Sequence, residues 1–134
     1  MTFDYNTDIN GRDMDRKSVE WLGSSRSDLL GMPQPVVKQF GFELGLVQNG
    51  LIPEGAIHLS HVENGVWELR ENHKGDTYRV VHLLRHEDTI FVLHCFKKKS
   101  TSGKAVPKAD TETIAARLTE AKARIAARRK QKGE

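Results

Sequence analysis

The sequence predicts an α+β protein in which helices pack on a small antiparallel sheet. Two stretches, near residues 33–49 and 110–127, carry apolar side chains at the three- and four-residue spacing of a helix. Between them, residues 66–98 hold three runs of strand-forming residues separated by short turns. The 134 residues, of which 37% are hydrophobic, suit one domain with its own core.

The first half of the chain is expected to supply two helices. Residues 1–16 show neither the periodicity of a helix nor that of a strand, so we expect a mobile leader outside the fold. A short β-prone run follows at residues 17–22, and a capping box at Ser25 and Asp28 predicts a brief helix through Leu30. The second helix begins near Pro33, ends at Asn49-Gly50, and has the apolar stripe Val37, Phe40, Leu44 and Val47.

The second half is expected to form three strands and a final helix. The strands are predicted at residues 66–72, 77–86 and 89–98, with short turns between them. Asp110 is a good N-cap for the helix that follows, whose apolar stripe is Ile114, Leu118, Ala121 and Ile125. We therefore assign residues 17–127 to the domain and residues 128–134 to a basic tail.

Composition and charge narrow the function classes. No apolar run approaches the ~20 residues of a membrane span, and the N-terminus lacks a signal-peptide core, so a cytoplasmic protein is expected. The single cysteine, Cys95, excludes an internal disulfide and a Cys-rich zinc site. Residues 1–96 carry nine Lys/Arg against fourteen Asp/Glu, whereas residues 97–134 carry twelve against four. The basic end suggests either a polyanionic partner or a solvated charged tail.

The two short turns predict which strand residues face each other. If each hairpin is symmetric about its turn, Arg70 lies across from Arg79, and Arg79 lies beside Phe96; a one-residue bulge would break this register. Alternation then gives one core face with Trp67, Leu69, Tyr78, Val80, Leu93 and Cys95. The other face holds Glu68, Arg70, Arg79, His94, Phe96 and Lys98. Opposed arginines repel, so either an anion such as phosphate binds between them or Glu68 neutralises the pair.

The histidines raise the question of a metal site. Their spacing matches no metal-binding motif, so we expect neither a metal nor a cofactor. His82 falls on the apolar face, where a hydrogen-bonded core residue is expected. His94 shares the basic face and titrates near neutral pH, so it is a candidate general acid or base, with a phosphate-binding or structural role as alternatives.

Three strings occur in order along the chain: Glu68-Leu69-Arg70, Tyr78-Arg79 and Phe96-Lys97-Lys98-Lys99-Ser100, followed by a proline and an amphipathic helix. From about Lys17 to Ala127 the chain resembles the RelE/HigB-like toxins of bacterial and phage type II toxin–antitoxin systems. The resemblance implies a RelE-like compact fold with a basic cleft. It also implies an mRNA endonuclease (mRNA interferase) that inhibits translation, on the ribosome or on free message. In such enzymes the RNA 2′-OH attacks the adjacent phosphate without a metal.

The resemblance further implies roles for single residues. Arg79 matches a catalytic arginine of the family, Lys98 falls where better-known members carry a second one, and Arg70 matches a basic position. Glu68 stands where RelE has a lysine, and a tyrosine of the family is absent near Lys104. Glu68 and His94 are therefore our candidates for the general base. The side chains expected to bind RNA are Lys97, Lys99, Lys104 and Phe96.

The implied partners are a cognate antitoxin, encoded by the neighbouring gene, together with mRNA and the ribosome, and no membrane. We expect the antitoxin to cover the basic cleft or to dock on the final helix through Ile114, Leu118 and Ile125. Two alternatives remain: a non-catalytic nucleic-acid-binding module that uses the same basic face, and a degenerate toxin that only binds its antitoxin. The feature that separates enzyme from binder is a proton-transfer group beside the arginines.

Overall fold

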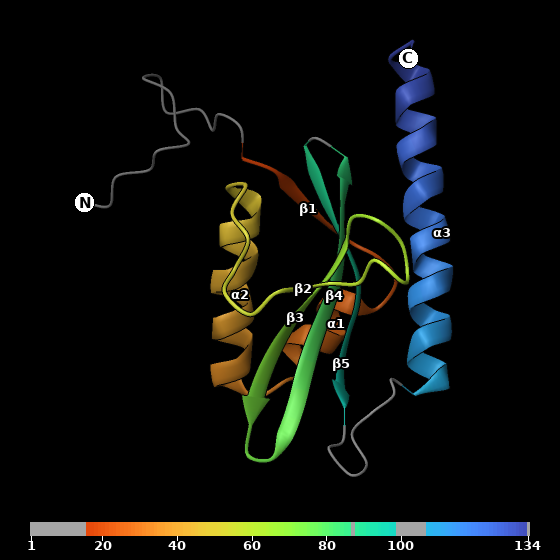
Figure 1. The fold of residues 1–134 in the computed structure, drawn as a ribbon. Helices are drawn as coiled ribbons and strands as arrows, with labels where there is room; N and C mark the ends of the chain where they lie inside the picture. Colours follow the sequence, from red (N-terminus) through yellow and green to blue (C-terminus); the bar gives the residue numbers. More distant parts are fainter. Residues whose placement is uncertain (1–15, 87, 99–106, 134) are drawn as a thin grey trace, which may run out of the picture.

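In the computed structural model, a five-stranded sheet lies between helices on both faces (Figure 1). The structure describes residues 16–86, 88–98 and 107–133, so the expected leader lies outside it except for Arg16. In chain order the elements are β1 (Ser18–Trp21), α1 (Ser25–Leu30), α2 (Gln34–Gln48), β2 (Ile57–His58), β3 (Val66–His73), β4 (Asp76–His86), β5 (Thr89–Lys98) and α3 (Lys108–Gln131). The α+β class is confirmed, and the arrangement is consistent with a compact RelE-like fold.

The sheet is mixed rather than wholly antiparallel. Its strand order is β1-β5-β4-β3-β2, and β1 pairs with β5 in the parallel sense while the other neighbours are antiparallel. The β3–β4 turn is tight because Lys74 and Gly75 both have positive φ angles, 49° and 85°. It therefore sets the predicted register, in which Arg70 lies opposite Arg79.

The β4–β5 register is as predicted from Thr77 to Val81 and again at His86, which lies opposite Thr89, but it is shifted by one residue between them. Arg79 lies opposite Phe96 and Val81 opposite His94, but the pairing then shifts, and His82 lies opposite Val92. This irregularity moves Leu93 to the other face of the sheet, so its predicted place beside Cys95 is wrong. Burial raises the pKa of the Cys95 thiol to about 12, which keeps it neutral in the core.

Each face of the sheet has its own hydrophobic core. On one face, α1 and α2 contribute Leu29, Val36, Phe40 and Leu44, which pack on Leu69, Tyr78, Val80, Val92 and Cys95. On the other face, α3 contributes Ile114, Leu118, Ala121 and Ile125, which pack on Val66, Val81, Leu83, Phe91 and Leu93. The face predicted to be basic is therefore apolar over most of its length, because α3 covers it.

The position of α3 corrects two expectations. Its apolar stripe is buried against the sheet, so the prediction that Ile114, Leu118 and Ile125 dock an antitoxin is wrong. The helix begins at Lys108, which places Asp110 within the first turn rather than at the N-cap. The helix continues to Gln131, and both Arg124 and Arg128 bind the carboxylate of Glu20 in β1.

His82 alternates with Val81 and so shares the apolar sheet face of Val80, as predicted, and it is 1% exposed. Burial lowers its pKa to about 4, so the imidazole is neutral near pH 7. Its Nδ1 atom is buried without a hydrogen-bond partner among the described residues, which differs from the hydrogen bonding expected of a core histidine.

Candidate functional site

Three cations surround one buried carboxylate where β3, β4 and β5 extend past the start of α3. The Glu68 carboxylate is 2% exposed, and its Oε2 accepts a hydrogen bond from Arg70 Nε at 2.8 Å. Its Oε1 accepts a second one from Arg79 Nη1 at 3.1 Å. We call Glu68, Arg70, Arg79 and Lys98 the cation cluster. The sequence left two alternatives for the opposed arginines: neutralisation by Glu68 or binding of an anion. Glu68 bridges the pair, but three cations around one carboxylate leave an excess of positive charge that an anion could neutralise.

The local sequence places these side chains together in a simple way. Glu68 and Arg70 are two residues apart on β3 and therefore share a face, and the tight turn brings Arg79 of β4 opposite Arg70. Lys98, opposite Thr77, ends β5 on the same face. The predicted face assignment is therefore confirmed for these four side chains.

Arg79 and Lys98 are unusually buried for cations, at 7% and 6% exposed. Desolvation lowers the pKa of Lys98, and the positive charges of Arg79 and Arg70 lower it further. The Nε of Arg79 has no hydrogen-bond partner among the described residues. The side chain of Arg70 is 43% exposed and forms the accessible edge of the cation cluster. Such a group of cations would be stabilised by an anion with several acceptor oxygens.

His94 lies on the same face but is held by a separate set of contacts. Its Nε2 is 2.7 Å from Asp110 Oδ1, and its Nδ1 is 3.4 Å from Arg117 Nη1. Because arginine can only donate, Nδ1 must be the unprotonated nitrogen, which leaves the proton on Nε2 to be donated to Asp110. The imidazole also stacks on Phe96, with ring centroids 4.7 Å apart. Both nitrogens of His94 are therefore engaged by the protein.

Asp110 and Arg117 were not singled out from the sequence as part of this site. Arg117 Nη1 also donates to the Leu93 carbonyl, and its Nη2 donates to Ser24 Oγ, so it ties α3 to β5 and to the residue before α1. The sequence held one indication that these two side chains face the sheet: positions 110 and 117 fall on the same side of α3 as its apolar stripe. The network explains how α3 is anchored next to the cation cluster.

The residues expected to bind RNA do not all meet in the structure. Phe96 is 7% exposed and packs in the core under α3. Lys97 lies on the opposite face of β5, is exposed, and its Nζ is 3.7 Å from Asp76 Oδ2. Lys99 and Lys104 lie outside the described residues.

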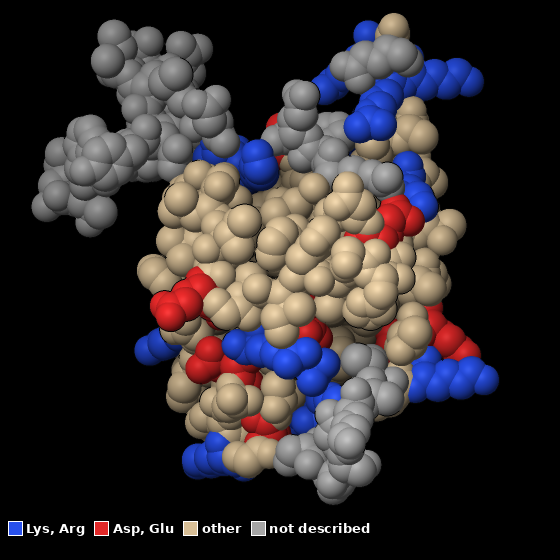
Figure 2. All heavy atoms as spheres, in the orientation of Figure 1, with Lys and Arg blue, Asp and Glu red and all other residues tan. Residues whose placement is uncertain are grey.

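Metal binding and the charged surface are described by two further findings. Among the side chains that the structure describes, which exclude those of residues 85–87, no three His, Cys, Asp or Glu come together as a metal site would require. Lys and Arg atoms also gather at the C-terminal end of α3, at the upper right of Figure 2. They belong to the run Arg128, Arg129, Lys130 and Lys132, which stands apart from the cation cluster at the other end of the helix.

Residues 27–119, from α1 to the middle of α3, match the family of Gp49-like phage-derived proteins (DUF891). The chain belongs to this family. The Gp49-like family is associated with the toxins of toxin–antitoxin systems, and the matched segment contains the whole cation cluster together with His94, Asp110 and Arg117. The chain matches none of the curated proteins and none of the solved structures with which it was compared. None of the described helices is both long and apolar enough to span a membrane.

Proposed function

We propose that this Gp49-like protein is the toxin of a type II toxin–antitoxin system and cuts mRNA, as the RelE/HigB toxins do. The observation that carries the proposal is the cation cluster, in which Arg70, Arg79 and Lys98 surround the single carboxylate of Glu68. A phosphodiester fits between two arginines because each planar guanidinium can donate two parallel hydrogen bonds to it.

The proposed reaction starts when a phosphate of the RNA binds Arg70 and Arg79 and takes over the hydrogen bonds that they give to Glu68. The freed carboxylate oxygen then accepts the proton of the adjacent 2′-OH. The O2′–P bond forms, the P–O5′ bond breaks, and the arginines stabilise the charge that builds on the phosphate oxygens. The lowered pKa of Lys98 suits it to give a proton to the leaving 5′-oxygen.

In this proposal His94 supports the site and does not transfer a proton. Both ring nitrogens already have partners, and its ring stacks on Phe96, which lies directly opposite Arg79. His94 therefore holds the β-strand surface behind the arginine in place. The reaction uses only side chains and the substrate's own hydroxyl, so it needs no metal or other cofactor.

The proposed partners follow from this activity: translated mRNA with its ribosome as substrate in the cytoplasm, and an antitoxin from the neighbouring gene as inhibitor. Family membership supports the antitoxin partner. A second candidate function, binding of nucleic acid without cleavage, is favoured by the burial of Arg79 and Lys98, which leaves Arg70 as the accessible cation.

Induced expression in bacteria, with RNA ends mapped after growth stops, tests the proposal. The wild type should arrest growth and create new RNA ends with a 5′-OH. Arg70→Ala should abolish both effects without unfolding the protein, because this side chain is 43% exposed. Lys38→Ala, which removes an exposed cation from α2 on the other face of the sheet, should leave both unchanged. Growth arrest without new RNA ends would support the non-cleaving alternative.

A further inference from the structure

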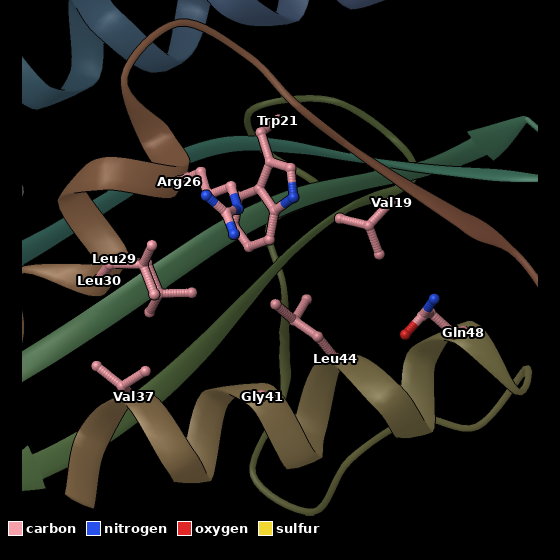
Figure 3. Close-up of a pocket in the computed structure, with 9 residues that line it drawn as sticks. All are labelled: Val19, Trp21, Arg26, Leu29, Leu30, Val37, Gly41, Leu44 and Gln48. Atoms are coloured by element: carbon pink, nitrogen blue, oxygen red, sulfur yellow. The ribbon is translucent and has the colours of Figure 1, made fainter. Parts of the chain in front are cut away.

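An apolar cleft of about 270 Å³ lies on the side of the sheet opposite the cation cluster, between α2 and the segment formed by β1 and α1. Figure 3 shows Val37, Gly41 and Leu44 along α2, facing Val19 and Trp21 across the opening. The other lining residues are Arg26, Leu29, Leu30 and Gln48. The cleft exists because α2 packs mainly on β3, which leaves the neighbouring surface near β1 uncovered.

The cleft leaves apolar surface in contact with water. Leu30 is 53% exposed, and Val19 and Trp21 are only partly buried. Phe42, which lies on α2 outside the lining of the cleft, is 62% exposed as well. An exposed apolar cleft of this kind marks a place where another chain binds.

Gly41 indicates the shape of the occupant. Glycine is unfavourable inside a helix, yet a Cβ atom at Gly41 would meet nothing within 4 Å, so no part of the described chain needs the space. Val37, Gly41, Leu44 and Gln48 extend along three turns of α2, or about 16 Å. A second helix laid along this row can approach α2 closely at Gly41, as ridges fit grooves between packed helices.

The charges around the cleft indicate the chemistry of the occupant. Arg26 lies beside Trp21 on the wall that faces α2 (Figure 3), and at the Gln48 end Arg16 Nη2 is 3.3 Å from Oε1 of Gln48. Among the lining residues that the structure describes, none is acidic. A helix with an apolar face and carboxylates on its flanks, placed to meet Arg26 and Arg16, complements this surface.

We propose that the cleft binds an amphipathic, acid-flanked helix of the antitoxin. This inference rests on the proposed function for the identity of the partner, but not on the catalytic mechanism. The sheet separates the cleft from the cation cluster. The helix therefore anchors the partner on the face opposite Arg70 and Arg79, and binding through it is measurable independently of RNA cleavage.

The test measures the affinity of the purified full-length protein for the purified product of the neighbouring gene. Trp21 lines the cleft, so its fluorescence, isolated in a Trp67→Phe background, reports directly on the occupant. Gly41→Glu places bulk and like charge in the cleft without meeting a neighbour within 4 Å, so the fold should be retained. Gln39→Glu makes a similar change at an exposed position of α2 that does not line the cleft.

The proposal predicts that the wild type binds and that the emission of Trp21 shifts. Gly41→Glu should bind at least tenfold more weakly, Arg26→Glu should weaken binding in the same direction, and Gln39→Glu should match the wild type. Absence of binding, equal affinity of Gly41→Glu and the wild type, or a dimer of the protein alone that Gly41→Glu dissociates would overturn it. RNA cleavage by the same variants without the partner is measured separately, so failure of the proposed function is recognised independently.

Discussion

Replacing Glu68 by Gln should destabilise the protein and at the same time increase its response to anions. The change keeps the shape of the side chain and removes the one carboxylate that bridges Arg70 and Arg79. Arg79 and Lys98 would then remain buried without that negative charge. Leaving a buried charge without its partner is among the most destabilising of single substitutions.

The magnitude follows from the geometry. At an effective dielectric constant of about 20, two unit charges about 4 Å apart attract by about 4 kcal/mol, which is the scale for the buried Glu68–Arg79 pair. The pair with the half-exposed Arg70 adds no more than about 1 kcal/mol. The amide oxygen of Gln keeps part of the hydrogen bonding, worth about 1–2 kcal/mol. We therefore expect the free energy of unfolding to fall by about 3 kcal/mol.

Urea denaturation measures this loss as a fall of about 1.5 M in the midpoint, for an ordinary slope near 2 kcal/mol per M. Sulfate should then stabilise Glu68→Gln more than the wild type, because the anion takes the place of the carboxylate between the arginines. Glu112→Gln, which removes an exposed carboxylate on α3, is the matched control and should change little. The reasoning is refuted if Glu68→Gln is as stable as the wild type and shows no added response to sulfate.

Three further predictions concern pH and packing. Burial, and then the charge of Glu71, raise the pKa of Glu43 from about 4.5 to about 7, so its contribution to stability is lost as pH rises through that range. The free energy of unfolding of Glu43→Gln, measured in urea, should therefore exceed that of the wild type by about 1–2 kcal/mol at pH 8 and equal it at pH 4. An equal excess at both pH values would contradict this. Burial lowers the pKa of His82 to about 4, so stability is lost as pH falls from about 6.5 towards 4. In thermal melts, the melting temperature of His82→Leu should fall less than that of the wild type between about pH 6.5 and pH 4. An equal fall would show that another group causes the loss. Gly23 has a φ of 53°, and a Cβ there would lie 2.7 Å from Arg117 Nε, so Gly23→Ala should lower stability by about 1–3 kcal/mol, measured in urea.

The local patterns predicted the three helices, the four longer strands and the cation cluster because these depend on short-range geometry, whereas the two-residue strand β2 was not predicted. A two-residue turn between alternating strands determines that Arg70 faces Arg79 and that Glu68 lies on the same face. The apolar spacing of α2 likewise predicted the burial of Phe40, Leu44 and Val47, whereas Val37 is only partly buried and the buried Val36 and Glu43 were not predicted. These features require no knowledge of how distant segments meet.

The features that the sequence did not predict depend on contacts between distant segments. The stripe of α3 predicts that one side of the helix is buried but not which face of the sheet it covers. Because α3 covers the face predicted to be basic, most of that face is a second core. The shift after Val81 moved Leu93 without any Gly or Pro nearby to signal a bulge. The contacts of Arg117 join three elements, so no local pattern reveals them.

Cleavage of a short RNA by the purified protein in excess EDTA, with and without ribosomes, tests the central claim most directly. The account predicts products with a 5′-OH and a 2′,3′-cyclic or 3′-phosphate, no cleavage when the nucleotide before the cut carries a 2′-deoxy sugar, and no cleavage by a folded Arg79→Ala variant. Cleavage that requires Mg²⁺, or that proceeds on the 2′-deoxy substrate, would contradict the proposal that the cation cluster drives attack by the 2′-OH.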